Sequence, residues 1–116
     1  MKRFLAIYIG TAAAFEKWNQ LDEAQRKARE AAGVEAWMGW GAKHASIIVD
    51  QGGPLGKTKR ISPEGIADIK NVMTGYVILE AESHEAAAKL FENHAHFTHF
   101  PGESVEIMEC LPMPEH

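Results

Sequence analysis

Three of the six histidines of this 116-residue chain lie within six positions of one another, at His94, His96 and His99. An imidazole titrates near neutral pH, so a histidine can serve as a general acid, a general base or a metal ligand. The cluster lies on residues 94–102, between a predicted helix and the last predicted strand. This segment is therefore the first candidate for a functional site.

His94 is expected at the end of a helix, on the side that faces the sheet. Burial and one polar partner could set its pKa for a general base or acid. The same position also suits a capping histidine, which donates to the last carbonyls of a helix and complements its dipole. Both roles are open, and His96 and His99, on the following irregular segment, could contact a ligand.

The same three histidines could also hold a metal ion. Zinc needs three or four ligands, with nitrogen at about 2.0–2.1 Å. His94, His96 and His99 could supply three, with Glu103 or His44 as the fourth. However, the spacing matches no established zinc motif and the segment contains no cysteine. We therefore predict no bound metal or other cofactor, and a metal-binding protein stays an alternative.

Two polar residues earlier in the chain are candidate partners for His94. His44 and Asp50 flank a predicted strand, and extended chain would put them about 20 Å apart. They cannot pair with each other along one straight strand, but either could meet His94 through the fold. The competing interpretation of His44 is a surface histidine that precedes a strand.

Aromatic and basic residues could complete a ligand pocket. Tyr8 and Trp40, with Trp37, could form apolar walls, although large aromatic side chains equally fill the space above a sheet. Arg60 ends the short basic run KTKR and could attract a small carboxylate. The glycine-rich stretch before this run lacks the spacing of a phosphate-binding loop, so no nucleotide site is expected.

Five apolar or alternating runs predict the β-strands that would position these residues. They lie at residues 4–9, 45–49, 57–61, 75–81 and 104–111. Between the second and third runs, residues 51–56 are rich in glycine and predict a turn. Cys110 falls within the last apolar run, so its thiol is expected to be buried and inert rather than nucleophilic.

Three segments predict helices. The first follows the cap Thr11, could break near residues 19–20 and is expected to end at Gly33. Residues 34–41 are then predicted to be irregular or a short helical turn. Ser62-Pro63-Glu64 predicts a second helix start, with Ile66 and Ile69 on its buried side. Residues 84–93 predict a third helix, capped by Ser83.

Strands that alternate with helices in this order predict a two-layer α+β domain. The helices would cover one face of an antiparallel sheet, and a ferredoxin-like sandwich is the natural arrangement. The chain is long enough for one modest core and shows no linker or repeat. We therefore expect a single domain over residues 1–116.

The predicted strands are apolar on both faces. In a sheet with one face in water, apolar and polar residues would alternate along each strand. Full burial of five or six such side chains contributes roughly 1.5–3 kcal/mol each. That sum is comparable with the whole stability of a small domain, about 5–15 kcal/mol. We expect a homodimer packed sheet to sheet about a twofold axis. The alternative is that residues 33–75 fold over the second face.

Composition restricts the other partners. The net charge of −4 and the scattered basic residues give no electrostatic reason to bind nucleic acid or an anionic membrane. No segment approaches the ~20 apolar residues of a membrane span. A single cysteine excludes an internal disulfide and favours a reducing, cytoplasmic setting. The expected partners are a small-molecule ligand and a second copy of the chain.

Four segments in the second half of the chain follow a known family pattern. That pattern is a glycine and an aliphatic strand with an acidic end, then a helix opened by serine, a polar-Pro-Phe motif and a Val-Glu-Val strand. The corresponding segments here are GYVILEAES, EAA, HAHF and GESVEI. In this order the chain resembles the YCII-related family. The resemblance implies a ferredoxin-like fold of the dimeric α/β barrel group, typically dimeric.

The chain departs from that family at the position of its acid–base pair. The family often has Asp-Pro-Phe after the helix, whereas His94 stands at the aspartate and Ala95 at the proline. The Asp-Gly-Pro-Phe motif of one branch is also missing, and residues 50–55 match it only loosely. The resemblance implies small-molecule chemistry on lactones and other small carbonyl compounds. It does not transfer a His–Asp dyad.

These observations predict a protein that binds a small organic acid or lactone-like molecule in a pocket near His94, and the first hypothesis is an enzyme that transfers a proton on it. His94 would be the acid or base, with His44 or Asp50 as its partner and with ligand contacts from Tyr8, Trp40, His96, His99 and Arg60. One alternative is a binding or regulatory module that uses the same pocket without turnover. The other is a protein that binds a metal through the histidine cluster.

Overall fold

The computed structural model describes residues 1–114 of the chain. Within these residues, an antiparallel sheet contains the strands β1 (Lys2–Ile9), β2 (Ile48–Pro54), β5 (Met73–Ala81) and β6 (Ser104–Glu109). The strand order is β2-β5-β1-β6. The first strand therefore lies in the centre, between β5 and the last strand. This is the ferredoxin-like order, so the predicted α+β fold is confirmed.

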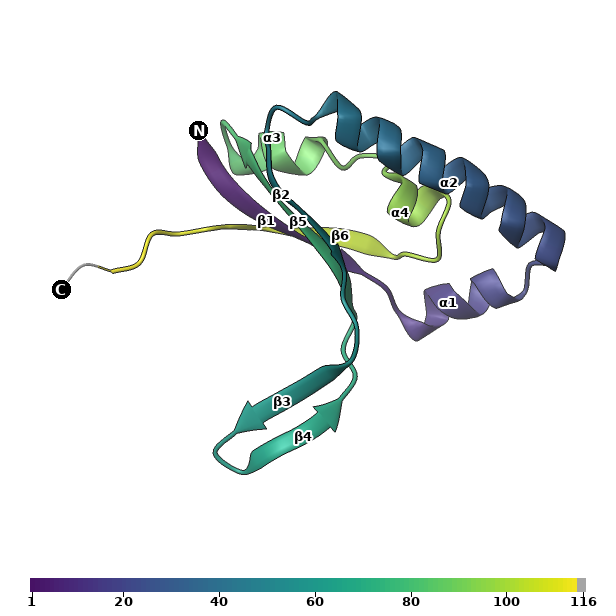
Figure 1. The fold of residues 1–116 in the computed structure, drawn as a ribbon, viewed down its shortest axis with the longest axis horizontal. Helices are drawn as coiled ribbons and strands as arrows, with labels where there is room; N and C mark the ends of the chain where they lie inside the picture. Colours follow the sequence, from purple (N-terminus) through teal and green to yellow (C-terminus); the bar gives the residue numbers. More distant parts are fainter. Residues whose placement is uncertain (115–116) are drawn as a thin grey trace.

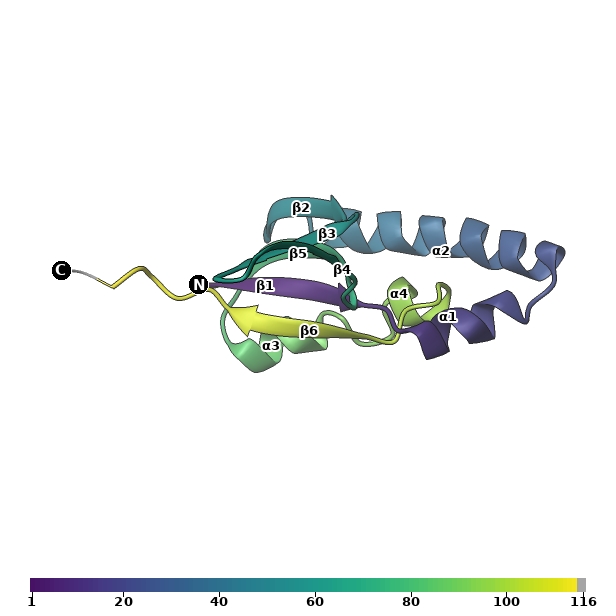
Figure 2. The same cartoon turned by 90° about the horizontal axis from the view of Figure 1, so that it is seen from below.

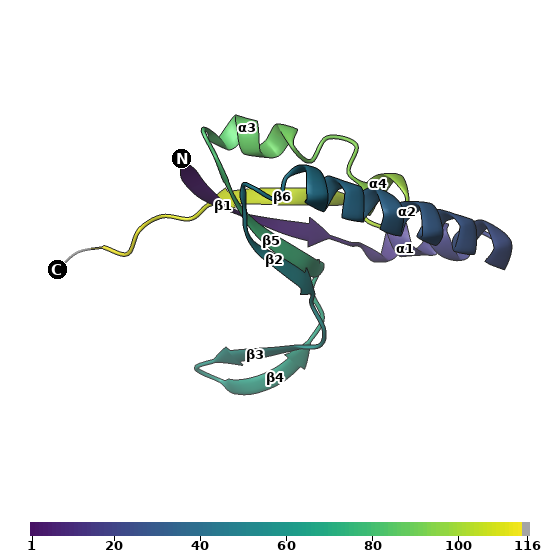
Figure 3. The ribbon, with the colours of Figure 1, turned by 45° about the horizontal axis from the view of Figure 1, so that its top comes forward.

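The helices α2, α3 and α4 lie on one side of this sheet (Figure 1). The helices of the described residues are α1 (Ala12–Asn19), α2 (Glu23–Lys43), α3 (His84–Lys89) and α4 (Ala95–Thr98). Figure 2 shows the strands side by side, with α2 extending well beyond the end of the sheet. A hairpin of β3 (Thr58–Ser62) and β4 (Gly65–Ile69) projects away from the helices, as Figure 3 shows.

Alternation along the strands separates the two faces of the sheet. The face toward the helices contributes Phe4, Ala6, Tyr8, Val77, Leu79 and Ala81 to the core, and Ala87 of α3 and Phe91 after it complete the cluster. The alternate positions pair with one another on the opposite face, with Leu5 facing Ile78 and Ile7 facing Tyr76. No helix of the described residues covers this second face in Figures 1 and 3. We call it the open face, and Glu106 and Met108 of β6 extend it.

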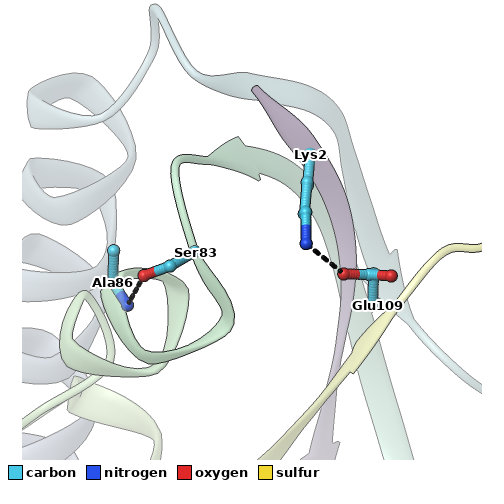
Figure 4. A network of polar contacts seen from close by, with 4 residues as sticks. All are labelled: Lys2, Ser83, Ala86 and Glu109. Carbon is cyan, nitrogen blue, oxygen red and sulfur yellow. Dashed lines mark hydrogen bonds and ion pairs between the residues drawn. The ribbon is translucent and has the colours of Figure 1, made fainter.

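Local hydrogen bonds explain where two of the helices begin. The hydroxyl of Thr11 accepts from the backbone N–H three residues later at 3.2 Å. Ser83 makes the same contact at 3.1 Å with Ala86 (Figure 4). Both caps were predicted, and each typically contributes about 1 kcal/mol. In the same view Lys2 Nζ pairs with Glu109 at 3.3 Å and links β1 to β6.

The first predicted helix is divided in two, close to the predicted break. α1 ends at Asn19, and a new helix begins after Asp22. The Asp22 carboxylate accepts from the N–H of Gln25 at 2.7 Å, and the Gln25 side chain accepts from the N–H of Asp22 at 3.1 Å. This reciprocal capping box is a local signal that starts α2.

The helix end predicted at Gly33 is wrong, because α2 continues to Lys43. Residues 34–41 are therefore helical rather than irregular. Gly33 lies where α2 meets the segment that follows α4, and a Cβ there would lie 2.6 Å from the Phe100 ring. The glycine permits a close approach between two parts of the chain and does not end the helix.

The strand predicted at residues 57–61 is confirmed as β3, but the helix predicted from Ser62 is wrong, because residues 63–69 form the turn and the second strand of the hairpin. Ser62 pairs with Gly65 and Ile61 with Ile66, in a regular antiparallel ladder. Gly65 has a φ of +113°, a conformation that other residues rarely adopt. Pro63 lies in the turn, where its fixed φ is compatible with the reversal of the chain.

The turn predicted for residues 51–56 is largely strand, because β2 extends to Pro54. Gly52 has a φ of +61°, and the ladder with β5 shifts register between Asp50 and Gly53. Glycine here forms an irregularity inside the strand rather than ending it. The strand predicted at residues 45–49 begins later, at Ile48, since α2 and the turn after it occupy the preceding residues.

Two elements near the C-terminus are shorter than predicted. α3 ends at Lys89 instead of near Asn93, and β6 ends at Glu109 instead of Leu111. Cys110 therefore follows the last strand and is exposed, so its predicted burial is wrong. No helix in residues 1–114 is long and apolar enough to cross a membrane. The single-domain assignment stays a prediction.

Candidate functional site

The segment that carries the histidine cluster turns sharply after α3. Asn93 has a left-handed backbone, with φ at +58°, which an asparagine tolerates better than most residues. His94 then becomes the N-cap of α4, and its Nδ1 accepts from the backbone N–H of His96 at 3.0 Å. One of the two predicted roles of His94, a cap at a helix C-terminus, is wrong because α3 has already ended at Lys89. His94 instead caps the start of the next helix.

His94 is enclosed by aromatic rings. Its side chain is 2% exposed, and its ring centroid lies 4.5–5.7 Å from those of Tyr8, Trp37, Trp40 and Phe91. Because Nδ1 accepts a hydrogen bond, Nε2 carries the proton of the neutral ring. Within residues 1–114 this buried Nε2 has no hydrogen-bond partner. The Trp37 ring stands perpendicular to the imidazole, in the edge-to-face geometry that aromatic pairs prefer.

Burial makes His94 a weak base. Removal from water disfavours the imidazolium form, and the neighbouring His96 adds to the effect. Together they lower the pKa of His94 to about 4. The ring is therefore neutral at physiological pH, and its hydrogen bond to the backbone of His96 fixes the start of α4.

His96 is held by the sheet. Its Nε2 donates to the backbone carbonyl of Ile9 at 2.8 Å, at the end of β1. This contact fixes a proton on Nε2, so in the neutral ring Nδ1 carries the lone pair. Burial lowers the pKa of His96, while the carbonyls of Ile9 and Ser104 oppose that shift. A side chain on Gly102 would collide with the imidazole, so the glycine allows the ring its position.

A cavity of about 1020 Å³ lies at the end of the sheet, between the strands and the helices α1 and α2. We call it the sheet-end cavity. Its walls are mostly apolar and aromatic, with Tyr8, Phe15, Trp37, Met38, Tyr76 and His96 among the lining residues. Its size and composition are those of a small-molecule site. His96 reaches this wall, whereas His94 is not among the lining residues and lies behind Trp37 and Tyr8.

Polar groups at the edge of the sheet-end cavity could orient a ligand. The Tyr76 hydroxyl donates to the Asp50 carboxylate at 3.3 Å, which joins β5 to β2. The negative charge of Asp50, followed by this hydrogen bond, raises the pKa of Tyr76. Lys70 also lines the cavity and supplies a positive charge. Asp50 is therefore linked to the cavity wall by its hydrogen bond with Tyr76. Among the described residues, no contact joins Asp50 to His94.

Trp40 and His44 lie deeper in the helical layer. Trp40 Nε1 donates to the carbonyl of Leu90 at 2.7 Å, and its ring contacts both His44 and His94. Trp40 is therefore a packing residue between α2 and the segment after α3. His44 caps the C-terminus of α2. Burial, and then the charge of Lys43, lower the pKa of His44.

The remaining predicted ligand contacts lie away from the sheet-end cavity. Arg60 is exposed on β3 of the projecting hairpin. His99 is half-buried, and its Nδ1 shares a 2.8 Å hydrogen bond with the Thr98 hydroxyl. Neither residue is among those that line the cavity.

The three clustered imidazoles do not converge on one point. His94 bonds to the backbone of α4, His96 to the carbonyl of Ile9, and His99 to Thr98. Within residues 1–114, no group of three or more His, Cys, Asp or Glu side chains could hold a metal ion. The geometry therefore offers no observation in favour of a metal-binding function.

One solved structure with a similar fold is 5-chloro-2-hydroxyhydroquinone dehydrochlorinase (TftG) from Burkholderia phenoliruptrix AC1100, in complex with 2,5-dihydroxybenzoquinone. The TM-score is 0.53 at 17% sequence identity, over 91% of this chain and 90% of that chain. No family model and no curated protein matches this chain. At this identity the similarity establishes a shared fold, and it agrees with the ferredoxin-like order of the strands.

Several lining residues of the sheet-end cavity were not predicted. Val34 and Met38 are four positions apart on α2, with Trp37 beside them. A helix predicted to continue past Gly33 would have placed these three residues on one face by their spacing. Tyr76 carried no such signal, because its place beside Asp50 depends on the pairing of β5 with β2.

Proposed function

We propose that this protein binds a small organic acid or lactone-like carbonyl compound in the sheet-end cavity and catalyses a proton transfer on it. The observation that supports this most is the state of His96 on the cavity wall. Its Nε2 proton is directed to Ile9, so Nδ1 carries a lone pair that can accept a proton from a bound ligand. A mostly apolar cavity would strengthen that interaction by excluding water.

In this proposal His96 is the base and His94 is a positioning residue. His94 was predicted as the acid or base from its place in the sequence. Its burial among aromatic rings instead favours a fixed, neutral ring that holds the backbone of His96. Asp50 and Tyr76 would contribute a hydrogen-bonding pair at the cavity edge, and Lys70 would attract an anionic ligand.

Two further observations support a small carbonyl compound as the ligand class. The chain shares its fold with a dehydrochlorinase solved with 2,5-dihydroxybenzoquinone, which is a small acidic ring carbonyl. The sequence pattern of the second half resembles the YCII-related family, and we propose membership of that group. A cytoplasmic setting and the absence of nucleic acid partners stay predictions.

We also propose that the protein is a homodimer packed through the open face. Leu5, Ile78 and Met108 leave apolar surface on that face, with Met108 41% exposed and the other two half-buried, whereas Ile7 on the same face is only 9% exposed. A second sheet related by a twofold axis would bury these side chains against their own copies. Each buried side chain of this size contributes roughly 1.5–3 kcal/mol.

The test uses 2,5-dihydroxybenzoquinone as the probe. Its binding is followed by quenching of tryptophan fluorescence, since Trp37 lines the cavity. Proton transfer is followed by NMR as the exchange of its ring hydrogens for deuterium in D2O, in which a deuteron from the solvent adds to the ring carbon and the hydrogen of that carbon leaves as a proton to the base. We expect saturable binding and exchange faster than in buffer. His96→Gln keeps an N–H that can donate to Ile9 but removes the base, and should slow exchange about 100-fold or more with binding retained.

His84→Gln is the matched control. His84 lies at the far end of the sheet and makes the same kind of contact, from Nε2 to the carbonyl of Ile107 at 2.7 Å. This variant should bind and exchange like the unaltered protein. Exchange at an unchanged rate in His96→Gln would remove His96 as the base. Saturable binding without any catalysed exchange would identify a binding module instead of an enzyme.

A further inference from the structure

The β3–β4 hairpin stands apart from the rest of the molecule. Its two strands pair only with each other within the described residues, from Thr58 opposite Ile69 to Ser62 opposite Gly65. Figures 1 and 3 show it projecting beyond the sheet, on the side away from the helices. An isolated two-stranded hairpin is marginally stable in water. A persistent hairpin in this position therefore needs a surface to pack against.

One face of the hairpin carries an unused apolar pair. Ile61 and Ile66 lie directly opposite each other, and they are 78% and 71% exposed. On the same face the next pair is Lys59 and Asp68, which form an ion pair of 2.6 Å. Two β-branched apolar side chains at the tip of a projecting arm are typical of a contact with another chain.

The charges of the hairpin complement those of the rest of the chain. Residues 57–70 contain four basic and two acidic side chains, whereas the remainder contains eight basic and fourteen acidic ones. The open face itself includes Glu106, which is exposed opposite Ile7, while Glu80 on the same face already pairs with Arg3 at 3.8 Å. A basic arm is therefore attracted to the body of another copy of this chain.

We infer that the β3–β4 hairpin is an arm that grips a second copy of this chain, with Ile61 and Ile66 buried against that copy. The inference rests on the proposed packing of two open faces. The arm projects on the side of the open face, so a second sheet placed there would lie beside it. The twofold axis gives the partner the same arm, and two arms would hold the dimer from both sides.

The test compares two isosteric double variants by analytical ultracentrifugation over a range of concentrations. The first variant, Ile61→Val with Ile66→Val, keeps the surface apolar. The second, Ile61→Thr with Ile66→Thr, differs from the first by a hydroxyl in place of one methyl group at each site. Valine and threonine both favour strands, so each variant should retain the hairpin. Each dimer contains four substituted side chains, and burial of one methyl group changes the dissociation constant by a factor of about four. The dimer dissociation constant should rise on the order of 100-fold from the valine to the threonine variant.

A second measurement follows the arm directly. In Cys110→Ser, the additional change Ile66→Cys places the only thiol at the tip of the hairpin. Its reaction with a thiol reagent should slow as the protein concentration rises through the dimer dissociation constant. Far-UV circular dichroism checks that each variant is folded.

The outcomes separate the arm from the dimer on which it rests. A protein that is monomeric at every concentration overturns both proposals. A dimer whose dissociation constant is equal in the valine and threonine variants, with a thiol at residue 66 that reacts equally at all concentrations, overturns the arm and leaves the sheet-to-sheet dimer standing. Weakened association together with concentration-dependent protection supports the arm.

Discussion

Acid should weaken this fold through His94, whose ring is buried and uncharged. The imidazole of an unfolded chain titrates near 6.5, whereas burial lowers the pKa of His94 in the folded chain to about 4. Between these two values the unfolded chain binds a proton that the folded chain does not. The contribution of His94 to stability is therefore complete above about pH 6.5 and decreases as the pH falls toward 4.

The size of the effect follows from the difference between the two pKa values. Each unit corresponds to 1.36 kcal/mol, and most of the difference is realised between pH 7.5 and 4.5. Solvent screening reduces the value, so we expect His94 to account for about 2 kcal/mol of lost stability over this range. His96, whose pKa is also lowered by burial, should add a further loss in the same direction.

The assay is urea unfolding, followed by circular dichroism at fixed protein concentration and at several pH values from 7.5 to 4.5. His94→Asn keeps a side-chain acceptor for the N-cap of α4 and removes the titrating ring. This variant should be less stable at every pH, because it leaves space among the aromatic rings. Its loss of stability between pH 7.5 and 4.5 should nevertheless be smaller by about 2 kcal/mol.

His99→Asn is the control for the same segment, since the His99 ring is half-buried and bonds only to Thr98. It should retain the pH dependence of the unaltered protein. An equal loss of stability on acidification in His94→Asn and in the unaltered protein would contradict this prediction. Such a result would mean that the aromatic enclosure of His94 does not disfavour its charge.

Two further predictions concern packing and electrostatics. Gly33→Ala should destabilise the fold by about 2 kcal/mol, because its Cβ would meet the Phe100 ring at 2.6 Å. In the same helix Gly39→Ala meets nothing within 4 Å and should stabilise by up to about 1 kcal/mol; equal effects in thermal unfolding would contradict the close approach at Gly33. Asp50→Asn should lower the pKa of Tyr76 by removing the charge that raises it; an unchanged ultraviolet titration of that phenol would contradict the pair.

Much of the fold could be predicted from local patterns. The apolar runs located β1, β5 and β6, and Thr11 and Ser83 correctly marked two helix starts. These signals act within one strand or one helical turn, so neighbouring residues in the sequence contain them. The run at residues 57–61 located β3, but the return strand β4 was missed because a serine and a proline are compatible with both a helix start and a turn.

The candidate site was only partly predictable. The spacing of the histidines directed attention to residues 94–99, and of these His96 lines the sheet-end cavity together with Tyr8. Which imidazole reaches the cavity could not be read from the spacing. That depends on the contact of His96 with Ile9, a residue 87 positions away, and on the rings that enclose His94.

The amino-acid sequence by itself determined the apolar strands, the helix caps and the excess of histidine near residue 96, because these depend on residues close together in the chain. Only the tertiary structure decided that Gly33 is a contact point, that Asp50 meets Tyr76, and that the two neighbouring imidazoles differ in access. Each of these properties depends on groups that are distant in sequence. Burial and close approach are set by the whole packed domain and not by any one segment.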